Sequence, residues 1–264
     1  MYLERILEGK REEIRRLRQV YRGEYFRKRV ISFEPARSLR KAVERHVGMP
    51  LIAEIKPASP SKGTIRKDVL PEVRAVQYRE GGAAAVSVLT ERQFFHGAPE
   101  WLMRVRRVVE LPVLRKDFIL DPVQLVESRW LGADAVLLIA SILEPGELRS
   151  LVHQARELGL ETLVEIHEEG ELPAALAAGP DLIGINNRDL STFETDLSVT
   201  ERLLPLVPPG IPVIGESGIA SPDDVVRLRR AGVSGVLVGE CLMRQEDPVT
   251  AVRELIGAGV DCAG

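Results

Sequence analysis

The sequence predicts an α/β fold, a closed (β/α)8 barrel with an N-terminal helical extension. Three observations support this prediction. Eight short runs rich in apolar and β-branched residues recur between residues 51 and 240, and their starts lie 21 to 33 residues apart. Segments with helical periodicity lie between the runs. The chain has 264 residues, close to the roughly 250 that such a barrel needs as one domain.

The first 47 residues are expected to be helical and to lie outside the repeating units. Apolar residues recur at helical spacing over residues 3–20, and a second helical piece is expected over residues 35–46. The stripe of the first piece consists of Leu3, Ile6, Leu7, Ile14, Leu17 and Val20. We expect residues 1–47 to form a helical cap packed on the barrel and residues 48–264 to form the barrel, as one structural domain overall.

The eight runs are predicted to be strands. They cover residues 51–56, 84–90, 112–118, 135–141, 161–167, 182–188, 212–218 and 235–240. Nearly continuous apolar strands that alternate with helices indicate a parallel sheet covered by helices, and eight such units fit a TIM barrel. Residues 145–159 and 221–232 are typical intervening helices. In the second, Ser221 suits the N-cap, Pro222 the first helical position and Gly232 the end.

Composition and charge exclude several classes of protein. The chain carries 36 basic and 39 acidic residues, a net charge of −3, which argues against a general nucleic-acid binder. It begins without an apolar leader, and no stretch approaches 18 uncharged apolar residues. Cys241 and Cys262 are too few for a disulfide framework, and no cysteine or histidine cluster has zinc spacing. We therefore expect a soluble, cytoplasmic protein with no membrane segment and no metal site.

Polar residues fall where the predicted strands end. Such a barrel carries its active site at the C-terminal ends of its strands. Ionisable groups would be costly inside the core of the barrel, so those found at strand ends are candidates for the active site. Residues of one parity point to one side of a strand. The polar and aromatic residues concerned are Glu54 and Lys56, Lys116 and Phe118, Glu165, Asn186 and Arg188, and Glu216. They predict a site built from several strands at one rim.

Two lysines stand out in this set. Only seven of the 36 basic residues are lysines, yet Lys56 and Lys116 lie in or at the end of predicted strands. Desolvation can lower the pKa of a lysine, so we expect these two to be usable proton donors near neutral pH. The alternative is a purely structural role, in which Lys56 pairs with Glu54 and Lys116 pairs with Glu165 at the barrel mouth.

Three loops are rich in groups that bind phosphate. Glycines follow the seventh and eighth predicted strands, where barrels of this kind usually hold a phosphate. The loop after the first strand adds Ser59, Ser61 and Lys62 as donors.

Aromatic residues are scarce, at 5%, yet four lie in or beside predicted loops and suit a wall for a flat apolar ligand. They are Phe94, Phe95, Phe118 and Phe193. His167 shares the parity of Glu165, and we expect it behind the site or exposed.

These residues lie in blocks that closely resemble indole-3-glycerol phosphate synthase. The blocks are IAEIKPASPSKG (52–63), SVLTERQFFHG (87–97), PVLRKDFILDPVQL (112–125), LVEIHEEGEL (163–172), GINNRDL (184–190), VIGESGI (213–219) and GVLVGECLMR (235–244), together with the N-terminal extension. The resemblance covers nearly the whole chain. It implies conversion of 1-(o-carboxyphenylamino)-1-deoxyribulose 5-phosphate into indole-3-glycerol phosphate, CO₂ and water, without a cofactor.

The resemblance also implies roles for individual residues. Lys116 is implied as the acid of ring closure. Lys56 and Glu165 are implied as the acid and base of dehydration, with Glu54 orienting them or sharing the proton. Asn186 is expected to bind a sugar hydroxyl, Arg188 to support the carboxylates or the substrate, and Glu216 and Ser217 to complete the catalytic rim. Phe118 and Pro60 are expected to contact the anthranilate ring, and Phe94, Leu137 and Leu190 are further expected substrate-binding residues. The expected phosphate contacts are Ser59, Gly218, Gly239 and, through its backbone, Glu240.

Three other functions are weighed against this one. A phosphoribosylanthranilate isomerase would use a cysteine and an aspartate at strand ends, but no cysteine precedes residue 241. A Schiff-base aldolase would use Lys56 or Lys116 as nucleophile. A barrel that only binds a phosphorylated ligand would not need two such lysines. The sequence does not decide whether the chain forms homo-oligomers or contacts other enzymes of the tryptophan pathway.

Overall fold

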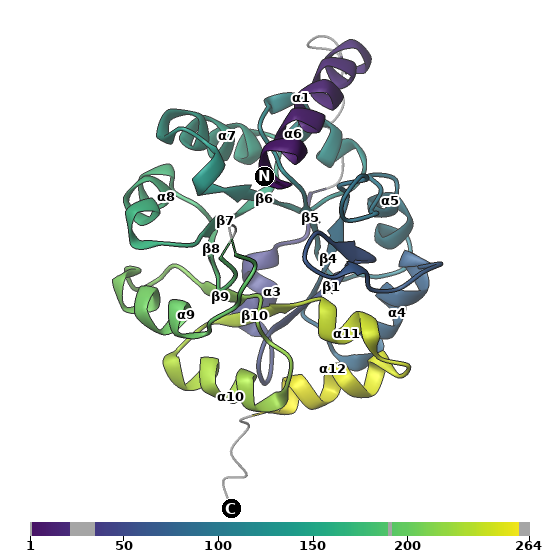
Figure 1. Cartoon of the computed structure of the whole chain (residues 1–264), viewed down its shortest axis with the longest axis vertical. Helices are drawn as coiled ribbons and strands as arrows, with labels where there is room; N and C mark the ends of the chain where they lie inside the picture. The colour runs from purple at the N-terminus through teal and green to yellow at the C-terminus, as the bar shows by residue number, and fades with distance from the viewer. Residues whose placement is uncertain (1, 22–34, 190–191, 259–264) are drawn as a thin grey trace, which may run out of the picture.

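Eight parallel strands close into a barrel in the computed structural model, which describes residues 2–21, 35–189 and 192–258. Around the barrel the order is β1-β10-β9-β8-β7-β6-β5-β4, and β4 pairs again with β1. Figure 1 looks down this ring. The strands are β1 (Leu51–Ile55), β4 (Ala85–Leu89), β5 (Val113–Lys116), β6 (Ala135–Ile139), β7 (Glu161–Ile166), β8 (Leu182–Asn186), β9 (Val213–Glu216) and β10 (Gly235–Val238). The predicted barrel is confirmed.

Each observed strand ends one or two residues before its predicted end. As a result Lys56, Phe118, Arg188 and Ser217 lie on loops just beyond the strands. The loop after β1 also contains a small hairpin, β2 (Ala58–Ser59) and β3 (Gly63–Thr64), which the sequence pattern does not predict.

Helices form the outer ring of the barrel. They are α4 (Pro71–Gly81), α5 (Trp101–Arg106), α6 (Pro122–Trp130), α7 (Pro145–Glu157), α8 (Leu172–Ala178), α9 (Ser198–Leu203), α10 (Pro222–Ala231) and α12 (Pro248–Gly257). The short helix α11 (Glu240–Arg244) follows β10 directly. α10 has the predicted ends. The Ser221 side chain accepts a hydrogen bond from the Asp224 backbone N–H, and Gly232 has a φ of 104°, which suits glycine at a helix end.

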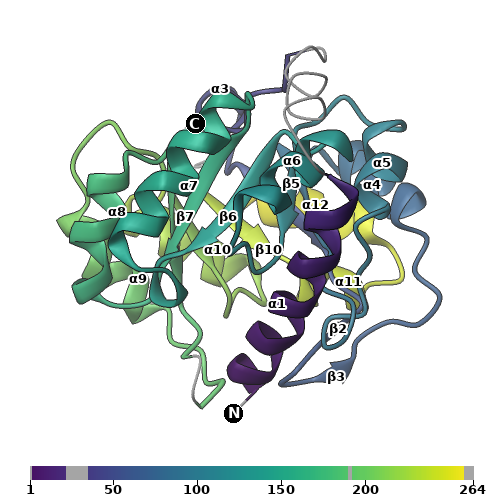
Figure 2. The ribbon, with the colours of Figure 1, turned by 90° about the horizontal axis from the view of Figure 1, so that it is seen from above.

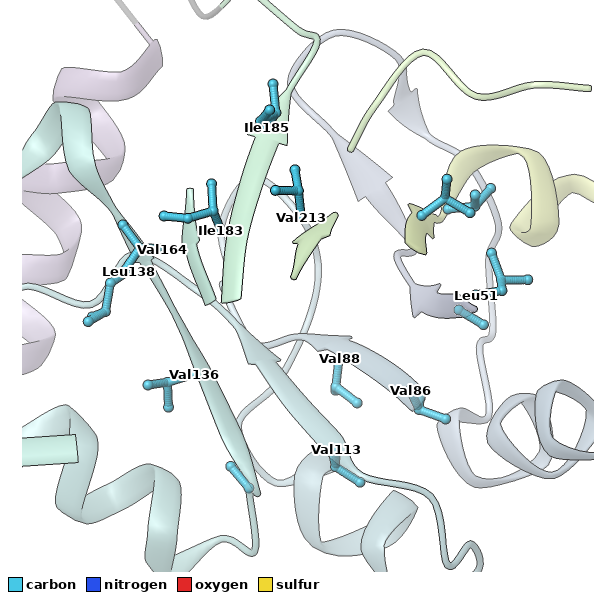
Figure 3. Close-up of a cluster of buried hydrophobic side chains, with 14 of the residues drawn as sticks. Leu51, Val86, Val88, Val113, Val136, Leu138, Val164, Ile183, Ile185 and Val213 are labelled. Atoms are coloured by element: carbon cyan, nitrogen blue, oxygen red, sulfur yellow. The ribbon is translucent and has the colours of Figure 1, made fainter. Parts of the chain in front are cut away.

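Apolar side chains fill two layers, one on each face of the strands. The outer layer packs beneath the helices, and Figure 3 shows part of it, including Leu51, Val86, Leu138 and Ile183. The inner layer fills the barrel itself. It contains Ile52, Ala85, Leu114, Ala135, Leu137, Leu163, Leu182, Ile214 and Leu237. The two layers follow from the alternation of side chains along each strand. The interior of the barrel is therefore a packed core, and space for a ligand is expected at the C-terminal ends of the strands.

The two described N-terminal helices lie at opposite ends of the barrel (Figures 1 and 2). α3 (Leu39–Arg45) closes the end where the strands begin. Its Leu39 and Val43 join the inner layer, and the Ser38 hydroxyl before it donates to Glu161 at 2.5 Å. α1 (Tyr2–Val20) lies at the other end. The division into a cap of residues 1–47 and a barrel of residues 48–264 stays a proposal. Among the described residues no helix is long and apolar enough to cross a membrane.

Candidate active site

A cavity of about 880 Å³ lies at the C-terminal ends of the strands. Every described residue of the predicted site lines it except Phe94, and Leu190 lies outside the described residues. The lining includes the predicted catalytic residues Lys116, Glu165, Lys56, Glu54, Asn186, Glu216 and Ser217, the predicted ring and substrate contacts Arg188, Phe118, Pro60 and Leu137, and the predicted phosphate contacts Ser59, Gly218, Gly239 and Glu240.

Lys116 is the centre of the charged part of the cavity. It ends β5, and its ammonium donates to Glu165 Oε2 on β7 at 2.7 Å and to Glu216 Oε2 on β9 at 2.5 Å. The Glu165 and Glu216 side chains are only 4% and 1% exposed. One half-buried ammonium therefore pairs with two buried carboxylates, which come from strands far apart in the sequence.

Two glycines make room for these carboxylates. A Cβ at Gly184, on β8, would lie 2.1 Å from Glu216 Oε1, and a Cβ at Gly239 would lie 2.3 Å from Glu54 Oε1. Both distances are far inside van der Waals contact. Any larger residue at either position would displace a carboxylate from the cavity wall, so these glycines help to build the site.

The two glutamates around Lys116 have different surroundings. Burial raises the pKa of Glu165, but the attraction of Lys116 and His167 outweighs burial and brings the pKa down to about 2. Burial also raises the pKa of Glu216, and here Lys116 does not compensate, so the pKa rises to about 8. Glu216 Oε1 is buried with no hydrogen-bond partner among the described residues, which agrees with that direction.

The expected lowering of the lysine pKa is wrong for Lys116. Burial lowers its pKa, as expected, but the attraction of Glu165, Glu216 and Glu54 is larger in sum and raises the pKa above its usual value. Sequence alone does not count the carboxylates around a buried amine. Lys116 is thus a firmly protonated ammonium, which suits a charged hydrogen-bond donor to a developing oxyanion and does not suit an amine nucleophile.

A second ion pair, between Lys56 and Glu54, lies in the cavity wall. Lys56 Nζ is 3.0 Å from Glu54 Oε1. Both ion pairs of the structural alternative therefore exist, and both face the cavity. Asn186 is held between neighbours, because its amide donates to Glu165 Oε1 at 3.1 Å and its Oδ1 accepts from the Arg188 backbone N–H at 3.0 Å.

The loop after β9 has an unusual backbone. Ser217 has a φ of 64° and Gly218 a φ of 77°, and a positive φ is uncommon for a residue other than glycine. The Asn187 amide holds this turn by donating to the carbonyl oxygens of Glu216 at 2.9 Å and Ser217 at 3.2 Å. Strained positions of this kind cluster at functional sites. The turn brings Ser217 and Gly218 into the lining of the cavity.

The apolar wall of the cavity differs from the expected one at Phe94. The Glu91 carboxylate accepts hydrogen bonds from the backbone N–H groups of Gln93, Phe94 and Phe95. These bonds hold the chain in a tight turn after β4. This turn places Phe95 against the cavity, and the Phe94 ring lies edge-on to Tyr2 at 6.0 Å between centroids.

α1 supplies cavity residues that the sequence pattern does not assign to the site. They are Tyr2, Leu3 and Ile6. The Tyr2 ring also meets Phe193 edge-on, at 5.8 Å between centroids. The apolar stripe of this helix was visible in the sequence, but its periodicity predicts only that the helix packs, and not that it packs at the mouth.

His167 lies behind Glu165, one of the two expected places. Its Nε2 is 3.3 Å from Glu165 Oε1, and its Nδ1 is 3.6 Å from Glu171 Oε2. Burial lowers the pKa of His167, but these two carboxylates outweigh burial and raise it.

Comparison with known proteins identifies the family. A model of the family described as indole-3-glycerol phosphate synthase matches residues 3–255. The chain is 48% identical over 260 residues to the indole-3-glycerol phosphate synthase of Desulforamulus reducens, covering 98% of each chain. The chain belongs to the indole-3-glycerol phosphate synthase family. The enzyme of Carboxydothermus hydrogenoformans is 46% identical over 263 residues, covering 97% of this chain and 100% of that one.

Membership in the indole-3-glycerol phosphate synthase family gives the activity. It is a carboxy-lyase reaction of tryptophan biosynthesis that acts on a phosphorylated substrate. Solved structures add support for the fold alone. The 3-hexulose-6-phosphate synthase of Salmonella typhimurium has a TM-score of 0.65 at 16% identity, covering 80% of this chain and 98% of that one. A thiamine phosphate pyrophosphorylase from Pyrococcus furiosus has a TM-score of 0.61 at 19% identity, covering 83% and 96%.

Proposed function

We propose that Lys116 is the acid that closes the indole ring. In this step the aromatic carbon attacks the carbonyl carbon of the ribulose chain, and the carbonyl oxygen takes a proton. The observation that supports this role is the pair of contacts at 2.7 Å and 2.5 Å, which hold the Lys116 ammonium in the cavity between Glu165 and Glu216. A fixed, charged donor aimed at a developing oxyanion is among the strongest catalytic devices known in proteins.

The later steps use the remaining charged groups. Loss of CO₂ leaves a hydroxyl that must depart as water, together with a proton from the neighbouring carbon. Glu165 is the proposed base for that proton, because its lowered pKa keeps it ionised. Lys56, held 3.0 Å from Glu54, is the proposed acid for the hydroxyl, with Glu54 orienting it. The protons balance, and each such transfer typically contributes about 10² to 10⁴ in rate.

The rest of the cavity is proposed to bind the substrate. The anthranilate ring would lie against Phe118 and Pro60, with Leu137 as a further substrate contact. Asn186 would bind a sugar hydroxyl, Arg188 the substrate, and Ser217 and Glu216 would complete the rim. The phosphate would lie at Ser59, Gly218, Gly239 and the Glu240 backbone, all of which line the cavity.

The proposed scheme uses only ionisable side chains of this chain, so the proposal includes no cofactor. Membership in the family supports a cytoplasmic location, which we propose for this protein as well.

The experiment follows indole fluorescence after the protein is mixed with 1-(o-carboxyphenylamino)-1-deoxyribulose 5-phosphate. We expect Lys116→Ala to abolish turnover and to leave substrate binding nearly intact. Lys41→Ala is the matched control, because Lys41 is an exposed lysine on α3 at the far end of the barrel, and it should keep full turnover. Turnover by Lys116→Ala within tenfold of wild type would overturn the acid assignment.

A further inference from the structure

A buried lysine on the N-terminal helix α1 contacts the residue that follows β5, the strand that ends in Lys116. Lys10 is the charged member of the three buried residues of α1, and its side chain is 2% exposed. Its ammonium lies 2.8 Å from Asp117 Oδ1 and 2.9 Å from Glu13 Oε2. By contrast, the Arg16–Glu12 pair of the same helix lies at the surface. Burying an ammonium is costly unless it is paired, so the contact with Asp117 is what allows Lys10 to be there.

Asp117 is a fully buried junction. Its Oδ2 accepts from the Thr90 hydroxyl and from Arg115 Nη2, the latter at 3.1 Å, and its Oδ1 accepts from the Phe118 backbone N–H at 2.8 Å. Arg115, itself fully buried, continues the network to Glu127 on α6 at 2.8 Å. Asp117, just after β5, is therefore bonded to Thr90 and Arg115 of the barrel and to Lys10 of α1.

The position of Asp117 in the sequence gives the junction its importance. Asp117 lies between Lys116, the proposed acid, and Phe118, a proposed wall of the ring site. Its carboxylate fixes the Phe118 backbone directly, and the Thr90 backbone N–H donates to the Lys116 carbonyl oxygen at 3.1 Å. A movement of Asp117 would therefore move the backbone from which the Lys116 side chain extends.

Stability alone is a weak explanation for this ion pair. Buried ion pairs contribute little net stability compared with apolar replacements, and their best-attested benefit is to fix one register of packing. The apolar contacts of α1 fix its position along its own axis less strictly than a directional charge contact does. With Lys10 paired to Asp117, Leu3 and Ile6 of the same helix line the cavity.

We propose that Lys10 is a positioning residue, which acts through Asp117 to hold Lys116 and Phe118 in their catalytic places. This inference rests on the role of Lys116 proposed above. It extends the working site beyond the barrel, because the N-terminal helix then determines the geometry of the acid as well as forming part of the cavity wall.

The test compares three variants of the full chain by kcat, KM and melting temperature. Lys10→Met removes the charge at similar length. Lys10→Arg keeps the charge and changes the reach and shape of the donor. Arg16→Gln is the matched control, because it removes an exposed ion pair of the same helix. A misplacement of about 1 Å at a catalytic group can cost about 10² in rate, so Lys10→Met should lose about 100-fold in kcat.

A positioning role predicts a division between the kinetic constants. KM should stay within about threefold in Lys10→Met, Lys10→Arg should lose about threefold to tenfold in kcat with its melting temperature nearly kept, and Arg16→Gln should match wild type. A raised KM with kcat kept in the lysine variants would show that α1 is only a wall. If Lys10→Met does not fold, Lys10→Arg decides alone, and an unchanged kcat there overturns the inference.

The outcome also separates this inference from the proposed function. Active Lys10 variants beside an inactive Lys116→Ala would reject only the positioning role. An active Lys116→Ala would reject the proposed acid itself.

Discussion

Replacing Lys116 with methionine should destabilise the protein through the carboxylates that it leaves behind. Methionine keeps most of the length and apolar contact of the lysine stem and removes the ammonium. Glu165 then loses its partner at 2.7 Å and Glu216 its partner at 2.5 Å, while both side chains stay almost fully buried. Glu165 keeps the Asn186 amide at 3.1 Å and His167 at 3.3 Å, which offset part of the loss.

The expected magnitude follows from which of the two carboxylates is charged. Glu216, with its pKa near 8, already holds a proton for much of the time at pH 7. The stranded charge is therefore mainly that of Glu165. Removing one partner of a buried ion pair costs about 3–5 kcal/mol, and the contacts left to Glu165 favour the lower end, about 3 kcal/mol. Against a total stability of about 5–15 kcal/mol the variant should still fold.

A double-mutant cycle measures this cost directly. The variants are Lys116→Met, Glu165→Gln and the two combined, each unfolded in urea at pH 7.5 and followed by circular dichroism. The double variant has no stranded charge, so it should regain about 2–3 kcal/mol relative to the sum of the single variants. Turnover, followed by indole fluorescence, should fall by about 10² to 10⁴ in Lys116→Met and should not return in the double variant.

The dependence on pH gives a second check of the same reasoning. In wild type the lowered pKa of Glu165 contributes stability that is present above about pH 4.3, the unfolded value, and is lost as pH falls through about 2. Lys116→Met lacks this contribution, so its deficit relative to wild type should be full at neutral pH and shrink as the solution is acidified. A loss below about 1 kcal/mol at pH 7.5, with no coupling to Glu165, would refute the charge argument.

Three further predictions concern neighbouring groups. Gly184→Ala should lower kcat at least tenfold and cost about 1–3 kcal/mol of stability by overpacking, because its Cβ would lie 2.1 Å from Glu216 Oε1. The control in urea unfolding is Gly146→Ala, whose Cβ would meet nothing within 4 Å and which should not lose stability. The profile of kcat/KM against pH should fall on the alkaline side near pH 8 as Glu216 loses its proton, and the same profile for Glu216→Gln should lack that fall; an unchanged profile would contradict the assignment. His167→Asn should raise the pKa of Glu165, since the attraction of the imidazole is lost, and should move the acid side of that profile to higher pH; an acid side that stays in place would show that His167 does not act on Glu165.

Much of the fold could be predicted from the sequence because each βα unit carries its own local signals. Ser221, Pro222 and Gly232 mark the ends of α10 as expected. The parity of residues within a strand and the direction of the strands also place Lys116, Glu165 and Glu216 at one rim. These predictions need only short-range rules and the topology of a parallel barrel.

The remaining features depend on contacts between distant segments. An amphipathic stripe shows that α1 and α3 pack, but it does not say that they pack at opposite ends of the barrel. The choice of Phe95 over Phe94 as a cavity residue depends on how the Glu91 carboxylate shapes its loop. The raised pKa of Lys116 depends on three carboxylates from three other strands.

The arrangement around Lys116 also explains how one site holds an acid and a base at the same pH. Two glutamates share the lysine, but Glu165 has additional partners in Asn186 and His167, while Glu216 Oε1 has no hydrogen-bond partner among the described residues. Environments that push two pKa values apart mark the acid and base of a reaction. In the proposed scheme Glu165 stays ionised as the base. Glu216, whose pKa is raised by burial, lies 2.5 Å from the Lys116 ammonium, so we expect it to return a proton to Lys116 after Lys116 has protonated the substrate.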